Sequence, residues 1–126
     1  QEILQALAPD YIRGLSLLGG EPMEPQNRAT VLSLVKKVRE IYPRKTIWCY
    51  TGYDFEKDVL DKMYYQWDFT HKFLSYLDVL VDGEFVEEKK VLDLRFRGST
   101  NQRILDVPKS LIAKKAVLWD EKGRYF

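Results

Sequence analysis

A chain of 126 residues suits a single domain, so residues 1–126 are taken as one unit. Hydrophobic residues make up 45% and charged residues 31%, the balance of an ordinary globular protein. A net charge of +1 gives no reason to expect a nucleic-acid partner, and no apolar run approaches the roughly 20 residues of a membrane span. The single cysteine, Cys49, excludes an internal disulfide and any metal site built from several cysteines of this chain, and it fits a reducing, cytoplasmic compartment.

The start of the chain is unusual. Its first residue is Gln1, and a helix-like stretch from Glu2 to about Ala8 follows at once, without a capping residue. We therefore expect the sequence to begin inside a larger domain, with removal of a short leader as the alternative.

Strand-like and helix-like stretches alternate along the chain. Apolar and β-branched runs predict strands, and apolar residues at helical spacing predict amphipathic helices. Such alternation favours an α/β fold with a mostly parallel sheet. The expected strands are 15–18, 46–50, 77–82, 91–96 and 116–119, and the expected helices are 25–42 and 56–76. The charged run 87–90 is expected to be a solvated hairpin or loop.

The turns that follow the strands hold most of the chemically interesting residues. They are Gly19-Gly20-Glu21-Pro22, Thr51-Gly52, Asp82-Gly83 and the segment 97–101. In a parallel sheet such turns share one edge, where ligands bind. We therefore predict that all four lie on the same rim of the sheet. A Gly-Gly pair after a strand is also typical of a plain tight turn.

Taken together, these motifs resemble one protein family. Gly-Gly-Glu-Pro at 19–22, Tyr-Thr-Gly-Tyr at 50–53, the run from Asp78 to Phe85 and Arg-Gly-Ser-Thr-Asn-Gln-Arg-Ile at 97–104 resemble the radical S-adenosylmethionine activating proteins of anaerobic ribonucleotide reductase. The resemblance runs from about Leu15 to Leu111. It implies a partial (β/α) barrel, a [4Fe–4S] cluster and S-adenosylmethionine, which yields a 5′-deoxyadenosyl radical. It also implies a partner, the large catalytic subunit of the reductase, on which a glycyl radical is formed.

The chain departs from that family at the cluster. The family holds its cluster with three cysteines in a Cys-x-x-x-Cys-x-x-Cys loop after the first strand, and this chain has no such loop. We expect the first strand and the loop to precede Gln1, and we expect no radical chemistry from the 126 residues alone. No residue of this chain is therefore assigned as catalytic or as a metal ligand.

The resemblance assigns cofactor-binding roles to the strand ends. Gly19, Gly20 and Glu21 are implied to bind the amino group of S-adenosylmethionine, since bare backbone offers carbonyl acceptors. Thr51 is implied either to bind the cofactor's carboxylate or ribose or to cap the next helix. Asp82 is implied either to accept from ribose hydroxyls or to form an Asp-Gly turn.

The donor-rich segment from Arg97 to Arg103 has more than one reading. Arg97 is able to pair with the cofactor's carboxylate in a bidentate fork, and Ser99 lets backbone approach a ligand. Part of the segment is instead able to shape the groove for the reductase's glycine loop, or to be a polar loop that satisfies its own backbone.

Other residues are expected to be structural. His71 lies on an aromatic-rich helical stretch, Cys49 reads as a small buried hydrophobe, and the exposed part of 64–73 is a candidate homodimer face. Asp78 is either a buried structural carboxylate or a strand-edge residue. The alternative functions are a non-catalytic α/β module or degenerate barrel that docks on a partner protein, and an unrelated small-molecule binding domain.

Overall fold

A four-stranded sheet organises the chain. The computed structural model describes residues 5–7, 14–17, 21–84, 86–89, 99 and 101–119. The strands β1 (Gly14–Leu17), β2 (Thr46–Tyr50), β3 (Val79–Asp82) and β4 (Arg103–Asp106) lie side by side in that order. The pairs β1–β2 and β2–β3 are parallel, and β4 is antiparallel to β3. The predicted α/β class with a mostly parallel sheet is confirmed, whereas β4 was not predicted.

The predicted helix 25–42 is confirmed, with a tighter first turn. A 3₁₀ turn, η1 (Pro25–Asn27), leads directly into α2 (Arg28–Ile41). Proline suits such a start because its missing N–H has no intrahelical partner there.

The predicted single helix 56–76 is wrong, because the structure divides it into three pieces. A π-helix, η2 (Phe55–Met63), runs into the short α3 (Tyr64–Gln66), and α4 (Asp68–Tyr76) follows. Trp67 breaks the helix with an extended backbone, φ −136° and ψ 129°. Its ring lies 3.5 Å from the guanidinium carbon of Arg28, so a tertiary contact holds the residue that interrupts the helix.

Near the end of the chain, the structure contains a helix that the sequence analysis missed. Helix α5 (Val107–Ala113) follows β4 without a loop, and the Asp106 carboxylate caps it by accepting from the Lys109 amide at 3.0 Å. Residues 87–90 were predicted to be a solvated hairpin or loop. Glu87–Lys89 form one 3₁₀ turn, η3, in which Glu87 and Glu88 are exposed, so their solvation is confirmed. The predicted strand 91–96 lies outside the described residues.

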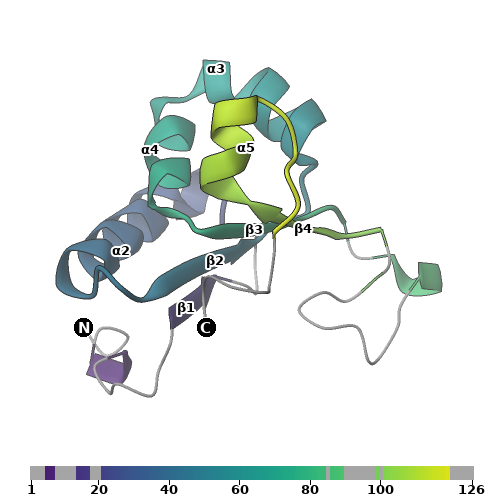
Figure 1. Ribbon diagram of the computed structural model, residues 1–126. Coiled ribbons are helices and arrows are strands. Elements are labelled where there is room, and N and C mark those ends of the chain that lie inside the picture. Colours follow the sequence, from purple (N-terminus) through teal and green to yellow (C-terminus); the bar gives the residue numbers. More distant parts are fainter. Residues whose placement is uncertain are drawn as a thin grey trace.

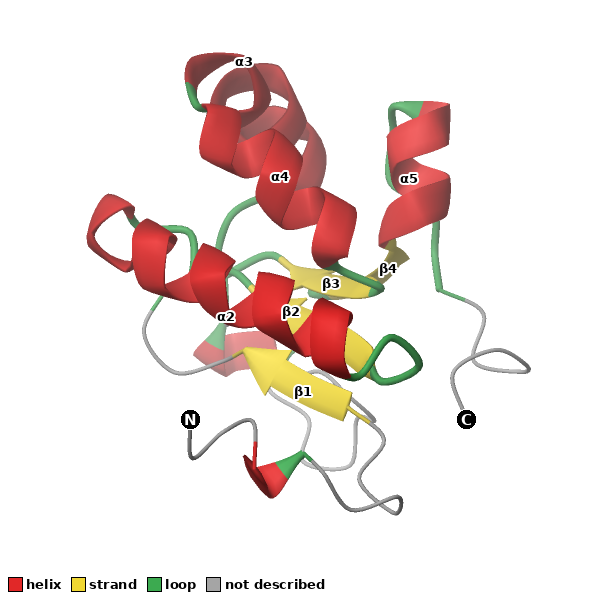
Figure 2. Cartoon of the chain, turned by 90° about the vertical axis from the view of Figure 1, so that its left-hand side faces the viewer, coloured by secondary structure: helices red, strands yellow, loops and turns green. Residues whose placement is uncertain are grey.

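The two faces of the sheet carry separate apolar clusters. Figures 1 and 2 show α2, α4 and α5 on the same side of the sheet. Ile47 and Cys49 of β2 pack toward the cluster shared with these helices, whereas Trp48 belongs to the cluster on the other face. This alternation buries both faces of β2, which explains its continuous apolar sequence.

The predicted strand 116–119 is reduced to an isolated bridge with backbone hydrogen bonds to β4. Leu118 forms an antiparallel bridge with Leu105, and the Trp119 amide donates to the Ile104 carbonyl at 2.9 Å. The Trp119 ring meets Trp48 edge to face, with ring centroids 5.0 Å apart. The segment thereby covers part of the face of the sheet opposite the helices.

The ends of the strands away from the rim are fastened by polar contacts. One Asp78 carboxylate oxygen accepts from the Ile47 amide at 2.8 Å and from Arg39 Nη2 at 2.9 Å. Of the two readings of Asp78, the hydrogen-bonded structural carboxylate is therefore supported, although its side chain is 19% exposed and not buried. Strand β1 approaches β2 so closely at Gly14 that a Cβ there would lie 2.1 Å from the Thr46 carbonyl oxygen. Only glycine fits at this position.

Among the described residues, no helix is both long and apolar enough to cross a membrane.

Candidate functional site

The end of β1 is joined to the end of β2 by the carboxylate of Glu21. Its Oε1 accepts from the Gly52 amide at 2.7 Å, and its Oε2 accepts from the Thr51 hydroxyl at 2.8 Å and from the Met23 amide at 3.1 Å. One side chain therefore holds the exit of the Gly-Gly-Glu-Pro turn against the next strand. A carboxylate has about four lone-pair sites, so these three bonds leave roughly one open to a ligand.

The end of β2 is joined in turn to the end of β3. The Gly83 amide donates to the Tyr53 carbonyl at 3.0 Å, and the Phe55 amide donates to Asp82 Oδ2 at 2.8 Å. Gly83 has a φ of 99°, a conformation that side chains other than glycine's rarely allow. The Asp-Gly turn therefore places the Asp82 carboxylate beneath the first residue of η2.

The segment before β4 completes the rim. Gln102 Nε2 donates to the Gly83 carbonyl at 3.0 Å, and Asn101 Nδ2 donates to the Glu84 carbonyl at 2.8 Å. Ser99, which is fully buried, donates from its hydroxyl to Asn101 Oδ1 at 2.7 Å. Because β4 is antiparallel, the residues that precede it lie at the same edge as the residues that follow β1, β2 and β3.

Arg103, the first residue of β4, ties several elements together. Its Nε and Nη2 donate to the two carboxylate oxygens of Asp82 at 3.0 and 2.6 Å, and its Nη1 donates to Glu56 Oε1 at 3.0 Å. Only 2% of the Asp82 side chain is exposed, so Arg103 supplies the counter-ion that a buried carboxylate needs. The Asp82 hydrogen bonds and charge raise the pKa of Arg103, which keeps the guanidinium charged.

Glu56 extends this network to the end of the described chain. Its Oε2 accepts from the Ala116 amide at 3.2 Å, while its Oε1 accepts from Arg103. These two bonds, the amide's first, lower the pKa of Glu56 below its ordinary value. Asp54 caps η2 by accepting from the Glu56 and Lys57 amides at 2.9 and 2.8 Å. The start of the π-helix is therefore fixed from several directions, and π-helices often occur at functional sites.

The structure brings together those predicted site residues that it describes. Glu21, Thr51, Asp82 and Ser99 all belong to the hydrogen-bonded rim, whereas Gly19, Gly20 and Arg97 lie outside the described residues. Thr51 does not cap the following helix, because Asp54 does so. Asp82 precedes a turn glycine, as one reading expected, but its carboxylate also pairs with Arg103.

Sequence analysis gave no role at the rim to Glu56, nor to Tyr53, although Tyr53 belongs to the Tyr-Thr-Gly-Tyr motif at 50–53. The only local signal for Glu56 was its place in the first turn of a helix that follows the cap residue Asp54. The Tyr53 hydroxyl donates to Glu24 Oε1 at 2.5 Å, and this bond, with smaller effects of burial and nearby carboxylates, raises the pKa of Tyr53 to about 12. Nothing in the spacing of these residues predicted that pair.

The charge of the rim suits a cationic ligand. The carboxylates of Glu21, Glu24 and Asp54 lie at the strand ends, and each is at least partly exposed. Asp54 Oδ2 lies 3.9 Å from Arg103 Nη2. Asp82 is neutralised by Arg103. S-adenosylmethionine carries a sulfonium and an ammonium against one carboxylate, so the donors and acceptors of this rim fit it.

The residues present do not fit an iron–sulfur cluster. Such a cluster is held by several thiolates, and this chain has one cysteine. Cys49 is fully buried in β2, and its burial, with a smaller effect of the Glu21 charge, raises the pKa of its thiol. A thiol in that environment stays protonated and is a poor metal ligand. Within the described part of the chain, no three His, Cys, Asp or Glu residues are placed to hold a metal ion.

Comparison with models of known protein families identifies the family of this chain. Residues 1–105 match the model of the 4Fe-4S single cluster domain. The chain belongs to this family. Its match to that domain, together with its single cysteine, means that a cluster in any protein that contains this chain needs ligands beyond these 126 residues.

Curated relatives carry one shared name, anaerobic ribonucleoside-triphosphate reductase-activating protein. The chain is 47% identical to the Vibrio cholerae protein over 92 residues. This aligned stretch covers 73% of the present chain and 54% of the relative. It is 38% identical to the Enterobacteria phage T4 protein over 104 residues, which cover 82% of this chain and 60% of the relative. It is 41% identical to the Haemophilus influenzae protein over 106 residues, which cover 82% of this chain and 63% of the relative.

The chain thus spans between 54% and 63% of the length of these relatives, which confirms the resemblance to the activating proteins for this part of them. No solved structure matches the chain.

The Arg103 network gives a stability prediction. Replacing Arg103 with alanine leaves the buried Asp82 carboxylate without its counter-ion, and breaking such a pair typically costs about 3 kcal/mol or more. We expect Arg103→Ala to lower the free energy of unfolding by about that amount in urea titrations, whereas Lys72→Ala on the exposed face of α4 changes it by less than about 0.5 kcal/mol. Equal losses in the two variants would contradict the role given to Arg103.

Glu56 gives a prediction about pH. Because its pKa is lowered in the folded state, its ionised form stabilises the fold. This contribution is fully present above the ordinary pKa of 4.5 and is lost as the pH falls through the lower folded-state pKa. We therefore expect the stability difference between wild type and Glu56→Gln to be constant near neutral pH and to shrink below about pH 4.5. Unfolding curves at a series of pH values measure this, with Glu40→Gln as an exposed control whose difference stays small throughout.

Proposed function

We propose that this chain forms the S-adenosylmethionine-binding part of a protein that activates anaerobic ribonucleoside-triphosphate reductase. The observation that carries the proposal is the carboxylate-rich rim in which Glu21 joins the ends of β1 and β2. The names of the relatives supply the partner, anaerobic ribonucleoside-triphosphate reductase. We take the large catalytic subunit as the part of that reductase on which this protein acts. The sheet is then the described part of a partial (β/α) barrel of the radical S-adenosylmethionine type.

In this proposal the rim binds the methionyl end of the cofactor. The carbonyl oxygens of Gly19 and Gly20 accept from its ammonium group, and the remaining lone pair of Glu21 adds negative charge beside it. Thr51 contributes by orienting Glu21, and Asp82 contributes by fixing the start of η2. When bound, S-adenosylmethionine supplies the 5′-deoxyadenosyl radical that generates the reductase's glycyl radical.

The donor-rich residues 97–103 bind the cofactor and support the backbone beside it. Arg97 pairs with the carboxylate of the cofactor, while Ser99 and Asn101 hold the backbone that faces it. The cluster ligands come from polypeptide outside these 126 residues, so the whole gene product, and not this chain by itself, carries the activity.

A non-catalytic docking module is the second candidate. One observation favours it: Glu21, Thr51 and Asp82 already have protein hydrogen-bond partners at the rim. The two functions differ in S-adenosylmethionine binding and in the glycyl radical signal of the reductase, measured by electron paramagnetic resonance. The activating function requires both, and a docking module gives neither.

The ligand site is tested by Gly20→Val in the full gene product, reconstituted with its cluster. A valine side chain blocks approach to the backbone, so we expect calorimetry to show loss of S-adenosylmethionine binding. Ile41→Val, on an exposed position of α2, serves as the control and is expected to bind normally. Unchanged affinity in Gly20→Val, with an unchanged melting temperature, would count against the assignment.

The metal content of the chain is also testable. Because its one cysteine is buried, we expect anaerobic reconstitution of the 126-residue chain with iron and sulfide to give no cluster absorbance. The full gene product treated in the same way should show the absorbance of a [4Fe–4S] cluster. A stable cluster signal from the 126 residues would show that our account of the ligands is wrong.

A further inference from the structure

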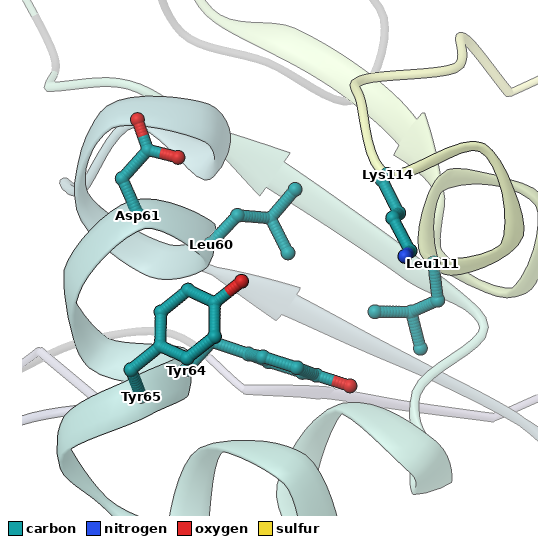
Figure 3. Close-up of a pocket in the computed structure, with 6 residues that line it drawn as sticks. All are labelled: Leu60, Asp61, Tyr64, Tyr65, Leu111 and Lys114. Carbon is teal, nitrogen blue, oxygen red and sulfur yellow. The ribbon is translucent and has the colours of Figure 1, made fainter.

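A pocket of about 330 Å³ opens on the helical side of the molecule, between the η2–α3 segment and α5 (Figure 3). Leu60 and Leu111 face each other across it, Tyr64 and Tyr65 form one wall, and Asp61 and Lys114 stand at opposite sides. None of these residues takes part in the hydrogen-bonded rim. The pocket is therefore a separate feature of the same domain.

Two strongly exposed hydrophobic side chains lie on the elements that line the pocket. Tyr65 is 82% exposed, and Ile112, next to Leu111 on α5, is 85% exposed. Among the described residues these are the two most exposed large hydrophobic side chains. A concavity that combines leucines, tyrosines and charged groups, on elements that also carry exposed hydrophobic side chains, is typical of a protein docking site, and tyrosine is enriched where such sites bind most strongly.

The charged residues on the α5 side of the pocket are all positive. Residues 107–115 contain Lys109, Lys114 and Lys115 and no acidic residue. Within the described part of the chain, Lys114 has no ion-pair partner. A polypeptide that docks here therefore gains from carboxylates that face α5.

Lys114 is also held in an unfavourable backbone conformation. It ends α5 with φ 59° and ψ 33°, and it is the only described residue other than glycine with a positive φ. Glycine or asparagine would adopt this conformation at lower cost. Strain at a non-glycine residue is a reason to look for function there, and the strained residue here places an ammonium at the edge of the pocket.

We propose that this pocket docks an acidic segment of the reductase polypeptide. One apolar side chain of that segment inserts between Leu60 and Leu111, beside Tyr64, and an adjacent carboxylate pairs with Lys114. The inference rests on the proposed function, because that function supplies the partner. Docking through the helices leaves the strand-end rim open to the cofactor and to the reacting glycine.

The experiment uses the full gene product and the anaerobic ribonucleoside-triphosphate reductase polypeptide from the same organism. Lys114→Gly removes the ammonium and relieves the positive φ, so we expect a higher melting temperature together with a roughly tenfold higher Kd for the reductase. Lys114→Glu and Tyr65→Ala should also raise that Kd. The controls are Lys72→Glu on α4 and Ile41→Ala on α2, both exposed and outside the pocket.

The outcomes separate this inference from the function on which it rests. Normal reductase affinity in Lys114→Gly and Tyr65→Ala overturns the docking site, whatever their stability. If these variants instead weaken self-association of the protein and leave its affinity for the reductase unchanged, the proposed reductase docking site is wrong. The pocket would then bind a second copy of this chain. Affinity for S-adenosylmethionine should stay unchanged in every variant. Its absence in the wild type would instead overturn the proposed function, while the Kd for the reductase remains measurable.

Discussion

The bidentate pair between Arg103 and the buried Asp82 is the interaction on which the arrangement of the rim depends. A carboxylate so deeply buried is tolerable only beside a cation, and the guanidinium that supplies the cation comes from the antiparallel strand. The same carboxylate accepts from the first amide of η2, and the same guanidinium donates to Glu56, which in turn holds Ala116. This one ion pair therefore fixes the relative positions of four parts of the chain: β3, β4, the π-helix and the segment around Ala116.

Glu21 has a comparable task at the other side of the rim. Its carboxylate was expected to meet a ligand's ammonium group, yet most of its hydrogen-bonding capacity is used on the end of β2. These two uses are compatible, since a carboxylate already oriented by protein donors is pre-organised and loses little freedom when a cation arrives. The rim therefore combines negative charge with rigidity, which is what a small cationic ligand needs for an oriented fit.

The helical side has a different character. Its pocket joins a strained lysine, an aspartate, two tyrosines and two leucines, features that suit a macromolecular partner better than a small polar ligand. The π-helix contributes to both places, because its first turn carries Glu56 toward Arg103 and its later residues, Leu60 and Asp61, line the pocket. One irregular helix thus stands between the proposed cofactor site and the proposed docking site.

The sequence by itself determined the α/β class, the strand 46–50, the helix 25–42 and the sharing of one rim by those strand-end turn residues that the structure describes, because apolar periodicity and glycine placement are local signals. It did not determine that β4 runs antiparallel, that Trp67 interrupts a helix, or that Glu21 and Asp82 are held by protein groups. Each of these was decided by contacts between residues distant in the chain: Arg103 with Asp82, Trp67 with Arg28, and Glu21 with Gly52. Local pattern fixes which segments become strands and helices, whereas the partners of a buried charge exist only once those segments have packed together.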